Sequence, residues 1–357
     1  MSTTQAVMGP PDQFEILRKV AENYGLQLHQ AESCRKVWKA ETSDGPKYLK
    51  RSKLAPADIL FIFEALEYLH ANGFRTAPRL WLSLDGTPYV TASDGIYILT
   101  DWFEGNELDF NNFSDLANAC RFLAEFHRCS QGFEPSLPHQ RTAWYGWPAK
   151  WERRIRELND FRSLALAEKE TSAFSRLYLR HFEPFYRQAV QSYERLLRSF
   201  YRHVADEGYR HKSFCHHDYS GRNILRNSRG HMALIDFDYC LRDIRIHDLI
   251  NLLLRNLRHQ EWNMDVCRFI LREYHRASKL SADEIEVMYV LLSWPEDFWQ
   301  VGLQYYYEKL PWPAQRFVRK LEHRIECRFL REKFLREFPS GNGIFHWKEA
   351  VSADDTM

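Results

Sequence analysis

The chain has 357 residues, of which 45% are hydrophobic and 15% aromatic, enough to bury the cores of two domains of ordinary size. Its 49 Lys and Arg residues nearly cancel its 48 Asp and Glu residues, and the net charge of +1 gives no reason to expect nucleic acid or an anionic membrane as a partner. No apolar run approaches the roughly 20 residues that span a bilayer, and residues 1–13 lack the apolar middle of a signal peptide, so we expect synthesis in the cytoplasm and no membrane span.

The first hundred residues are predicted to form two β-hairpins with one helix between them. The turn signal Asp44-Gly45 separates the strands of the first hairpin. Residues 58–71 carry apolar side chains at helical spacing, and Asn72-Gly73 ends that helix. The predicted strands are residues 35–40, 47–51, 88–92 and 96–102.

The remainder of the chain is predicted to be mainly helical. One β interruption, residues 224–225 and 232–237, breaks this pattern. Because hairpins give way to long amphipathic stretches, we predict an α+β protein with a small β-rich N-lobe, residues 1–104, and a large helical C-lobe, residues 105–357. The amphipathic stretches are residues 115–129, 151–168, 186–204, 246–278, 282–292 and 314–338.

The most informative segment of the chain surrounds the β interruption. His216, Asp218 and Asn223 fit the pattern H-x-D-x-x-x-x-N, and Asp236 follows thirteen positions after Asn223, at the end of an apolar strand. A short hairpin between Asn223 and Asp236 would bring the second carboxylate back beside the loop that carries the first. The sequence therefore predicts that these oxygens converge on one point.

These residue types suit phosphoryl transfer. That reaction needs a carboxylate to accept the proton of the attacking hydroxyl, and oxygen ligands for the magnesium ion that neutralises the phosphates. Asp218 is the candidate for the first task. Asn223 and Asp236 are the candidates for the second.

A chance match and a zinc site are the alternatives to a phosphoryl-transfer site in this segment. The H-x-D-x-x-x-x-N pattern alone could arise by chance on a polar loop. The pattern followed by a hairpin and Asp236 is much less frequent by chance. A zinc site would use His216, His217 and Asp218, but adjacent residues seldom ligate one ion and no H-x-x-x-H or C-x-x-C pattern is present. His216 is better interpreted as a side chain that braces the loop by hydrogen bonding to backbone near Asp236.

The N-lobe is expected to supply the rest of a nucleotide site. Lys50, late in its strand, could reach the phosphates, and Glu64 or Glu67 on the following helix could hold it by an ion pair. The simpler alternative is a solvated lysine on a strand. The end of the second hairpin would then face adenine as a hinge, with Asp101 and Phe103 as candidate nucleotide-binding residues.

The sequence resembles the aminoglycoside phosphotransferase and choline kinase-like branch of the protein kinase-like fold. More closely, it resembles the CotS family of bacterial spore coat proteins. The segments that carry this resemblance span most of the chain. They are residues 47–50, 123–127, 214–225, 234–238 and 246–249.

The resemblance implies a bilobal kinase-like fold that uses ATP and Mg²⁺. In that family pattern Asp218 matches the catalytic base, Asn223 and Asp236 match the metal ligands, and Lys50 matches the phosphate-binding lysine. The resemblance also implies synthesis in the mother cell during sporulation and deposition in the spore coat, with other coat proteins as candidate partners.

Two features depart from the pattern of kinases. Residues 27–36 contain no glycine, so no glycine-rich loop can bring backbone N–H groups onto the phosphates. Tyr48 lies two positions before Lys50 on the same strand face, where kinases commonly keep a smaller residue above adenine. Both departures predict weak or altered nucleotide binding.

Three functions compete at this point. The leading hypothesis is a phosphotransferase that acts on a hydroxyl of a small molecule, a sugar or a coat component. The alternatives are a pseudokinase that serves as a structural coat protein, and a protein Ser/Thr kinase. The aromatic residues between 294 and 312 form either a substrate pocket or helix core.

Overall fold

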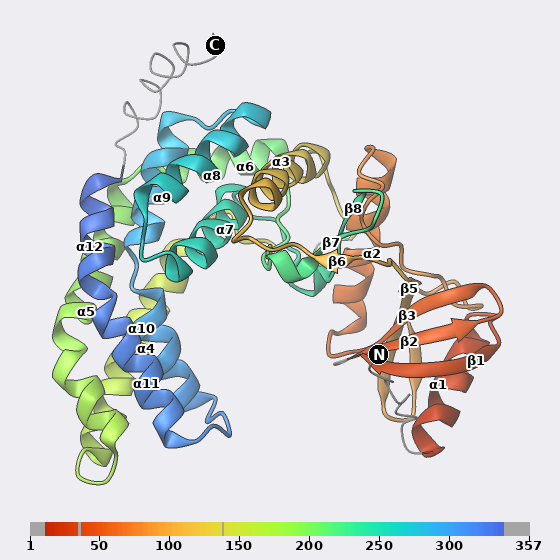
Figure 1. Cartoon of the computed structure of the whole chain (residues 1–357), viewed down its shortest axis with the longest axis horizontal. Coiled ribbons are helices and arrows are strands. Elements are labelled where there is room, and N and C mark those ends of the chain that lie inside the picture. The colour runs from red at the N-terminus through yellow and green to blue at the C-terminus, as the bar shows by residue number, and fades with distance from the viewer. Residues whose placement is uncertain (1–10, 35–36, 138, 339–357) are drawn as a thin grey trace. The chain divides into compact units, whose positions relative to one another are not determined.

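The computed structural model describes residues 11–34, 37–137 and 139–338, which form two compact units (Figure 1). The first unit comprises Met1–Thr142 and Lys212–Arg242, and the second comprises Ala143–His211 and Asp243–Met357. No helix in these described ranges is long and apolar enough to cross a membrane. The expected boundary at residue 104 falls inside the first unit, and an N-lobe of residues 1–104 stays a prediction.

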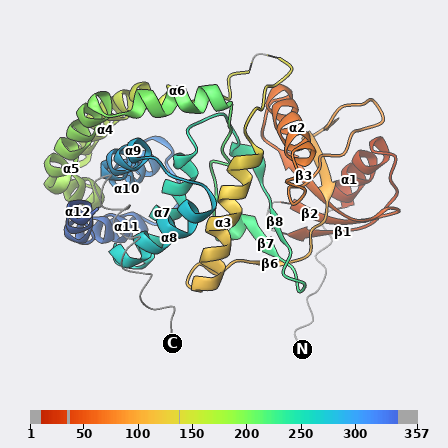
Figure 2. The ribbon, with the colours of Figure 1, turned by 90° about the horizontal axis from the view of Figure 1, so that it is seen from above.

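The first unit contains two antiparallel sheets and several helices. The larger sheet has the strand order β1-β2-β3-β5-β4, and the smaller has the order β6-β7-β8. Figure 2 shows the smaller sheet beside α3. The elements are α1 (Pro11–Asn23), β1 (Leu28–Cys34), β2 (Val37–Thr42), β3 (Gly45–Ser52), α2 (Pro56–Ala71), β4 (Val90–Ala92), β5 (Gly95–Asp101), β6 (Asn106–Glu107), α3 (Phe113–Cys129), β7 (Ile224–Arg226) and β8 (Met232–Leu234).

The two faces of the larger sheet have different roles. Leu49 of β3 lies opposite Leu99 of β5, and both are fully buried in a core with Leu17 of α1. Because side chains alternate along a strand, Tyr48 and Lys50 point to the other face. The core on one face therefore fixes the strands that present Lys50 on the other.

Both hairpins and the helix between them are confirmed. Gly45 takes a left-handed φ of 83° in the first turn, which glycine adopts without steric cost. Residues 35–36 of the first predicted strand lie outside the described residues. α1 and β1 were not predicted, because α1 is largely polar and depends on packing its few apolar side chains against the sheet.

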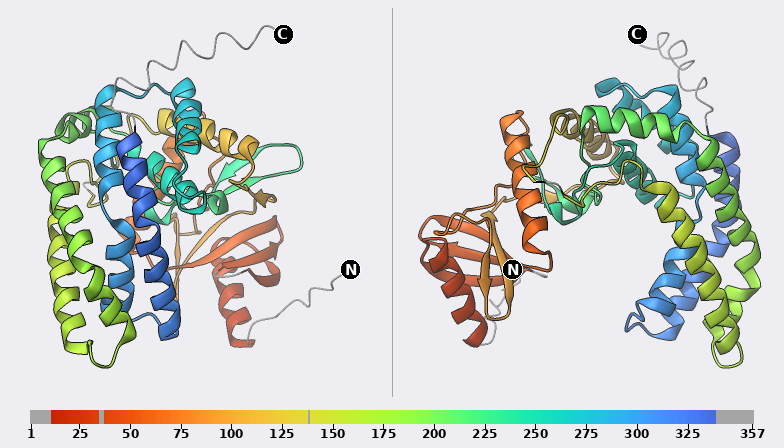
Figure 3. Two further views of the ribbon diagram at one scale, coloured as in Figure 1. Left: turned by 60° about the vertical axis from the view of Figure 1, so that its left-hand side comes forward. Right: turned by 180° about the vertical axis from the view of Figure 1, so that it is seen from behind.

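The second unit is built almost wholly of helices. Figure 3 shows α4 and α5 side by side, with α10 and α11 along them. Together with the antiparallel sheets of the first unit, this confirms the expected α+β class. The elements are α4 (Trp147–Glu168), α5 (Ala173–Arg198), α6 (Tyr201–His211), α7 (Ile246–His259), α8 (Met264–Ala277), α9 (Ala282–Ser293), α10 (Glu296–Gly302), a π-helical turn (Leu303–Tyr307), α11 (Ala314–Glu326) and α12 (Arg328–Glu337).

Three predicted helices have the wrong bounds. The stretch 246–278 is two helices, because Glu261 and Trp262 take left-handed φ angles of 49° and 59° and end the helical path. The stretch 314–338 divides at Cys327 into α11 and α12. The stretch 186–204 was placed too late, since α5 begins at Ala173 and continues through an internal proline.

The aromatic residues between 294 and 312 lie mainly in the core of the second unit. The ring of Tyr305 stacks on Phe174 with centroids 4.0 Å apart, and Tyr306 is buried against Phe161. Trp299 is also buried and donates its indole N–H to Glu157 at 2.7 Å. These contacts favour helix core over a substrate pocket for this segment.

Candidate active site

The loop that carries the H-x-D-x-x-x-x-N pattern is braced by His216. The backbone N–H of Asp218 donates to its Nδ1 at 3.2 Å, and its Nε2 lies 2.9 Å from the carbonyl oxygen of Ile235. Because Nδ1 accepts, Nε2 carries the proton and donates to Ile235. The expected bracing role is confirmed, and neither ring nitrogen is left to ligate zinc.

Asn223 holds Asp218 from the end of a 3₁₀ turn, Gly221–Asn223. Its side-chain Nδ2 donates to the carbonyl oxygen of Asp218 at 2.8 Å and to the carboxylate Oδ2 at 3.0 Å. Its own carbonyl accepts the N–H of Ile235 at 2.9 Å. The strand end before Asp236 is thereby tied to the loop that contains Asp218.

The same loop is anchored to two other parts of the first unit. Tyr219 is fully buried and donates its hydroxyl to the carbonyl oxygen of Ala119 in α3 at 2.7 Å. The N–H of Leu108 donates to the carbonyl of Gly221 at 3.1 Å, and a Cβ at Gly221 would clash with the Leu108 carbonyl oxygen. Only glycine fits this close approach without moving the backbone.

Asp236 lies at the point where β8 ends and its backbone is left-handed, with φ of 63° and ψ of 68°. Asp is one of the few residue types that tolerate this conformation, which costs some free energy and is typical of functional sites. The turn aims the carboxylate at Lys50, whose Nζ lies 2.7 Å from Oδ1 of Asp236.

Lys50 also contacts a second carboxylate. Its Nζ lies 2.7 Å from Oδ2 of Asp238, and its side chain is only 14% exposed. Burial acts to lower the pKa of Lys50, but the carboxylates of Asp238 and Asp236 outweigh burial and raise the pKa above its ordinary value. The ammonium therefore stays charged throughout the physiological range.

Arg141 connects this loop to the first turn of α2. Its Nη1 donates to the carbonyl oxygens of Asp238 and Cys240, both at 2.8 Å, and its Nε donates to Oδ1 of Asp58 at 2.7 Å. The loop after Asp236 and the start of α2 are therefore held by one guanidinium group.

A cavity of about 630 Å³ in the first unit extends from Lys50 and Asp236 along the sheet and α2. Its apolar wall includes Ile62, Leu66 and Ile98. The volume and the mixture of apolar walls with a few charged groups are typical of a small-molecule or cofactor site. Tyr48 also lines the cavity, on the strand face where kinases commonly keep a smaller residue.

Glu64 does not pair with Lys50 in this structure. Its carboxylate accepts hydrogen bonds from the backbone N–H of Ser136 at 2.8 Å and from the Ser136 hydroxyl. Ile62 and Leu66 face the cavity, and Glu64 lies about 200° around the helix from Ile62, so its side chain points away. Oε1 of Glu67 lies 3.4 Å from Nε of Arg79, so Glu67 pairs with that arginine instead. A nucleotide-binding role for Glu64 stays a prediction.

The end of β5 forms one edge of the cavity, and its role as a hinge that faces adenine stays a prediction. Asp101 and Phe103 both line the cavity. The carboxylate of Asp101 accepts from Nζ of Lys47 and from Nε1 of Trp81, each at 3.0 Å. Its side chain is therefore engaged by neighbouring residues, and any contact with a nucleotide base would come from the backbone of this segment.

The side chains brought together here match the groups that a magnesium nucleotide needs. Asn223 and Asp236 offer amide and carboxylate oxygens, the ligand type that magnesium prefers, and Lys50 offers a fixed positive charge. The donor set therefore fits ATP with magnesium.

Comparison with known proteins agrees with this geometry. Residues 27–288 match the phosphotransferase enzyme family. The chain belongs to this family. The match spans both the Lys50 strand and the loop from His216 to Asp236.

The individual proteins that this chain resembles share a quarter or less of its residues. It is 25% identical over 324 residues to spore coat protein S of Bacillus subtilis (strain 168), covering 88% of this chain and 90% of the relative. Among solved structures, an aminoglycoside phosphotransferase from Alicyclobacillus acidocaldarius has a TM-score of 0.76 at 22% identity, covering 97% of this chain and 99% of that one. A spectinomycin phosphotransferase, solved with ADP and spectinomycin, has a TM-score of 0.57 at 12% identity, covering 92% and 99%.

Sequence reasoning missed two residues of this site. Asp238 could have been noticed, because it lies two positions after Asp236 in an acidic pair. Arg141 carries no local signal, since its partners Asp58 and Asp238 are 83 and 97 positions away in the sequence.

Proposed function

We propose that this chain is an ATP-dependent phosphotransferase that moves the terminal phosphate of ATP to a hydroxyl of a small molecule, a sugar or a spore coat component. The observation that carries the proposal is the ion pair of Lys50 with Asp236, at a strand end that Asn223 ties to the loop of Asp218. A protein without catalytic function has no physical need to gather Asp236 and Asp238 around one half-buried lysine.

Each residue has a separate task in this proposal. Asp218 accepts the proton of the acceptor hydroxyl, and the hydrogen bond from Asn223 orients its carboxylate. Asn223 and Asp236 would hold magnesium, which supplies neutralisation of phosphate charge when bound. Lys50 binds the phosphates of ATP, and its raised pKa keeps it protonated for that task.

Relatives support nucleotide binding. The spectinomycin phosphotransferase was solved with ADP. An amicoumacin kinase, with a TM-score of 0.56 at 15% identity, covering 92% of this chain and 94% of that one, was solved with AMP-PNP and Ca²⁺. We extend nucleotide binding, with magnesium as the physiological cation, to this chain.

The similarity to spore coat protein S supports a place in the spore coat. We infer synthesis in the mother cell, deposition in the coat, and other coat proteins as partners. The acceptor would then be a hydroxyl compound present at that location.

A pseudokinase that serves as a structural coat protein is the second candidate. It is favoured by the absence of glycine from residues 27–36 and by the direct ion pairs of Lys50 with Asp236 and Asp238, which satisfy the lysine without any phosphate. The two candidates differ in whether the phosphates of ATP replace Asp236 and Asp238 as the partners of Lys50.

Phosphate transfer from labelled ATP separates the two candidates. The wild-type protein and Asp218→Asn are incubated with magnesium, ATP and a panel of sugars, amino alcohols and coat extract. If the protein is an enzyme, Asp218→Asn should retain its affinity for nucleotide while turnover falls by roughly 10² to 10⁴, the usual loss for a general base. If wild type transfers no phosphate to water or any acceptor, the structural candidate takes its place.

A further inference from the structure

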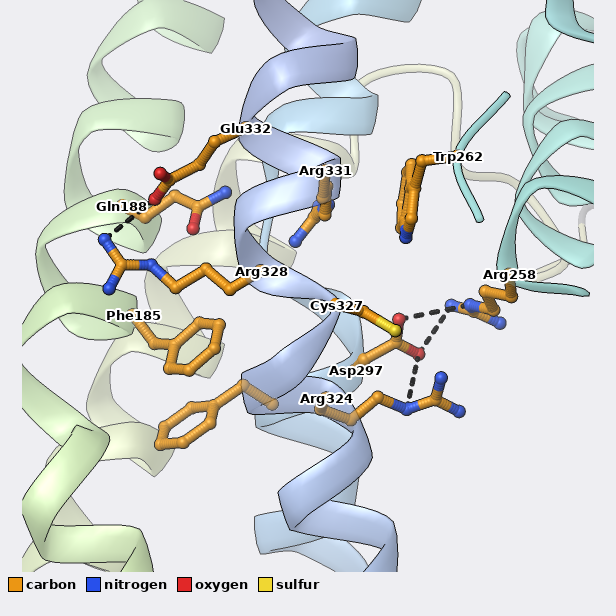
Figure 4. Close-up of a pocket in the computed structure, with 11 residues that line it drawn as sticks. Phe185, Gln188, Arg258, Trp262, Asp297, Arg324, Cys327, Arg328, Arg331 and Glu332 are labelled. Carbon is orange, nitrogen blue, oxygen red and sulfur yellow. Dashed lines mark hydrogen bonds and ion pairs between the residues drawn. The ribbon is translucent and has the colours of Figure 1, made fainter. Parts of the chain in front are cut away.

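Among the lysines and arginines that the structure describes, three are buried: Lys47 of β3, Arg154 of α4 and Arg331 of α12. Arg331 lines a cavity of the second unit with room for about 20 Å³, enough for one water, and the arginine head groups there point to different sides (Figure 4). Its Nη2 donates to the carbonyl oxygens of Leu292, at 2.7 Å, and Trp294, at the end of α9. Arg154 pairs with Glu296. Both arginines therefore brace helices of the second unit.

Lys47 differs from them because it contacts a residue that lines the candidate nucleotide cavity. Its Nζ lies 2.9 Å from Oδ2 of Asp44, 3.0 Å from Oδ1 of Asp101 and 4.2 Å from the ring centre of Trp81. The indole Nε1 of Trp81 donates to the same oxygen of Asp101 at 3.0 Å. Burial acts to lower the pKa of Lys47, but the hydrogen bonds with Asp44 and Asp101 outweigh burial and raise the pKa. Lys47 thus joins the turn before β3 to the last residue of β5.

The backbone that follows this contact lines the cavity. Asp101, Trp102 and Phe103 are three consecutive residues of its wall, whereas Lys47 and Trp81 do not line it. The N–H of Trp102 donates to the carbonyl oxygen of Pro46 at 3.3 Å, so the strand pairing of β3 ends just beyond Asp101. Lys47 and Trp81 can therefore act on a ligand only through the position of Asp101.

The contact lies away from the phosphate-binding lysine. Lys47 is opposite Asp101 in the pairing of β3 with β5, and Lys50 is opposite Ile98. Three residues along an antiparallel strand span about 10 Å. A nucleotide whose phosphates bind Lys50 therefore places its base, and not its phosphates, toward the end of β5 at Asp101.

The stability of the fold does not explain the buried charge of Lys47. The side chains of Asp44 and Asp101 are each 60% exposed, so both carboxylates would stay hydrated if the ammonium were removed. An apolar side chain of similar length could keep the contact with Trp81, and such replacements of buried ion pairs are often neutral. What the ammonium adds is a fixed direction for the carboxylate of Asp101.

We propose that Lys47 and Trp81 are positioning residues for the base of the nucleotide. They hold the carboxylate of Asp101 from two sides, and thereby fix the backbone of residues 101–103 where it faces the base. This role rests on the proposed function, since it requires that a nucleotide enters the cavity. It extends that function to two residues that contact neither the phosphates nor the metal.

Calorimetric titration of ATP into the full-length protein, with magnesium and with a chelator, tests this proposal. Lys47→Met should bind ATP about fivefold more weakly than wild type, by the same factor in both conditions, because the metal side of the cavity is untouched. Trp81→Phe, which removes the indole N–H and keeps a ring against Lys47, should also weaken ATP binding. The urea midpoint of Lys47→Met should stay close to that of wild type, which separates positioning from a structural role.

A double-mutant cycle shows whether Lys47 acts through Asp101. Asp101→Ala should weaken ATP binding about as much as Lys47→Met does. Adding Lys47→Met to Asp101→Ala should then change the affinity by less than about twofold, because the contact is already lost. Lys53→Met, at an exposed lysine just after β3, is the matched control and should bind ATP as wild type does.

The outcomes separate this role from the proposed function. If wild type binds ATP and Lys47→Met binds it within about twofold of wild type, or if the losses in the cycle are fully additive, the positioning role is wrong and the phosphotransferase proposal is unaffected. If Lys47→Met weakens ATP binding as expected but wild type transfers no phosphate, the positioning role holds and the phosphotransferase proposal fails. If wild type binds no ATP, both are wrong.

Discussion

Nζ of Lys50 lies 2.7 Å from Oδ1 of Asp236, although the two residues are 186 positions apart in the sequence. Asp238 contacts the same ammonium at 2.7 Å. The lysine thus holds two carboxylates, one of which we expect to receive magnesium. In this arrangement the ammonium of Lys50 neutralises the carboxylate that magnesium would neutralise. Binding of a magnesium nucleotide therefore has to replace the ion pairs of Lys50 with Asp236 and Asp238 by contacts of Lys50 with phosphate and of Asp236 with magnesium.

Replacing Lys50 by Met should change nucleotide and metal binding in opposite directions. Affinity for ATP with magnesium should fall by about tenfold or more, because the phosphates lose their positive charge. Affinity for magnesium alone should rise, since Asp236 and Asp238 lose the ammonium that neutralises them. Calorimetry with each ligand measures both effects. Lys53→Met, at an exposed lysine just after β3, should leave both unchanged, and a parallel fall of both affinities in Lys50→Met would contradict the account.

Arg141 should act on nucleotide binding through the loop that it holds. Arg141→Met removes the hydrogen bonds to the carbonyls of Asp238 and Cys240, so the loop after Asp236 loses its fixed position. We expect affinity for ATP with magnesium to fall about tenfold, and affinity for ATP without magnesium to change much less. Arg128→Met, at an exposed arginine of α3, serves as the control. Equal losses with and without magnesium would indicate general destabilisation instead of loop positioning.

The arrangement of the candidate site around residues 218–236 was predictable because its parts lie on one continuous segment. Asp218, Asn223 and Asp236 are joined by a loop and a short hairpin, so their spacing alone indicates convergence. The direction of Glu64 was not predictable in the same way, since a helix rotates by about 100° per residue and packing decides which face turns inward. Arg141 depends on contacts between distant segments, which no local pattern encodes.

Gly221 should tolerate no side chain. In Gly221→Ala the new Cβ meets the carbonyl oxygen of Leu108, a backbone atom that cannot rotate away. We expect a loss of about 1–3 kcal/mol in the free energy of unfolding, together with weaker nucleotide binding because the loop shifts. Urea denaturation measures the first effect. Ser228→Ala, at an exposed turn position, should stay within about 0.5 kcal/mol of wild type, and a Gly221→Ala protein as stable as that control would refute the close approach.

The lowered pKa of Lys150, in the second unit, should make the free energy of unfolding depend on pH. Its Nζ lies 4.1 Å from the ring centre of Trp147, and burial, helped by the neighbouring Arg154, lowers its pKa to about 8. An unfolded lysine titrates near 10.4, so between about pH 8 and 10.4 the unfolded chain binds more protons than the folded one. The free energy of unfolding should therefore rise over this range, by on the order of 1 kcal/mol.

Lys150→Met isolates this effect from other groups that titrate at alkaline pH. Methionine keeps the apolar contact with Trp147 but carries no charge. The difference in unfolding free energy between wild type and variant, measured in urea at several pH values, should move in favour of wild type as pH rises through 8. A difference that is independent of pH would show that Lys150 titrates as an ordinary lysine.

The measurement that tests the central claim most directly is calorimetric titration of ATP into wild type and Asp236→Asn, each with magnesium and with a chelator. Wild type should bind ATP, and magnesium should strengthen that binding. Asp236→Asn should bind at least about tenfold more weakly in the presence of magnesium and gain little from the metal, because the carboxylate ligand is lost. If wild type binds no nucleotide, or if Asp236→Asn binds ATP with the affinity and magnesium dependence of wild type, the site around Lys50 and Asp236 is not a magnesium nucleotide site.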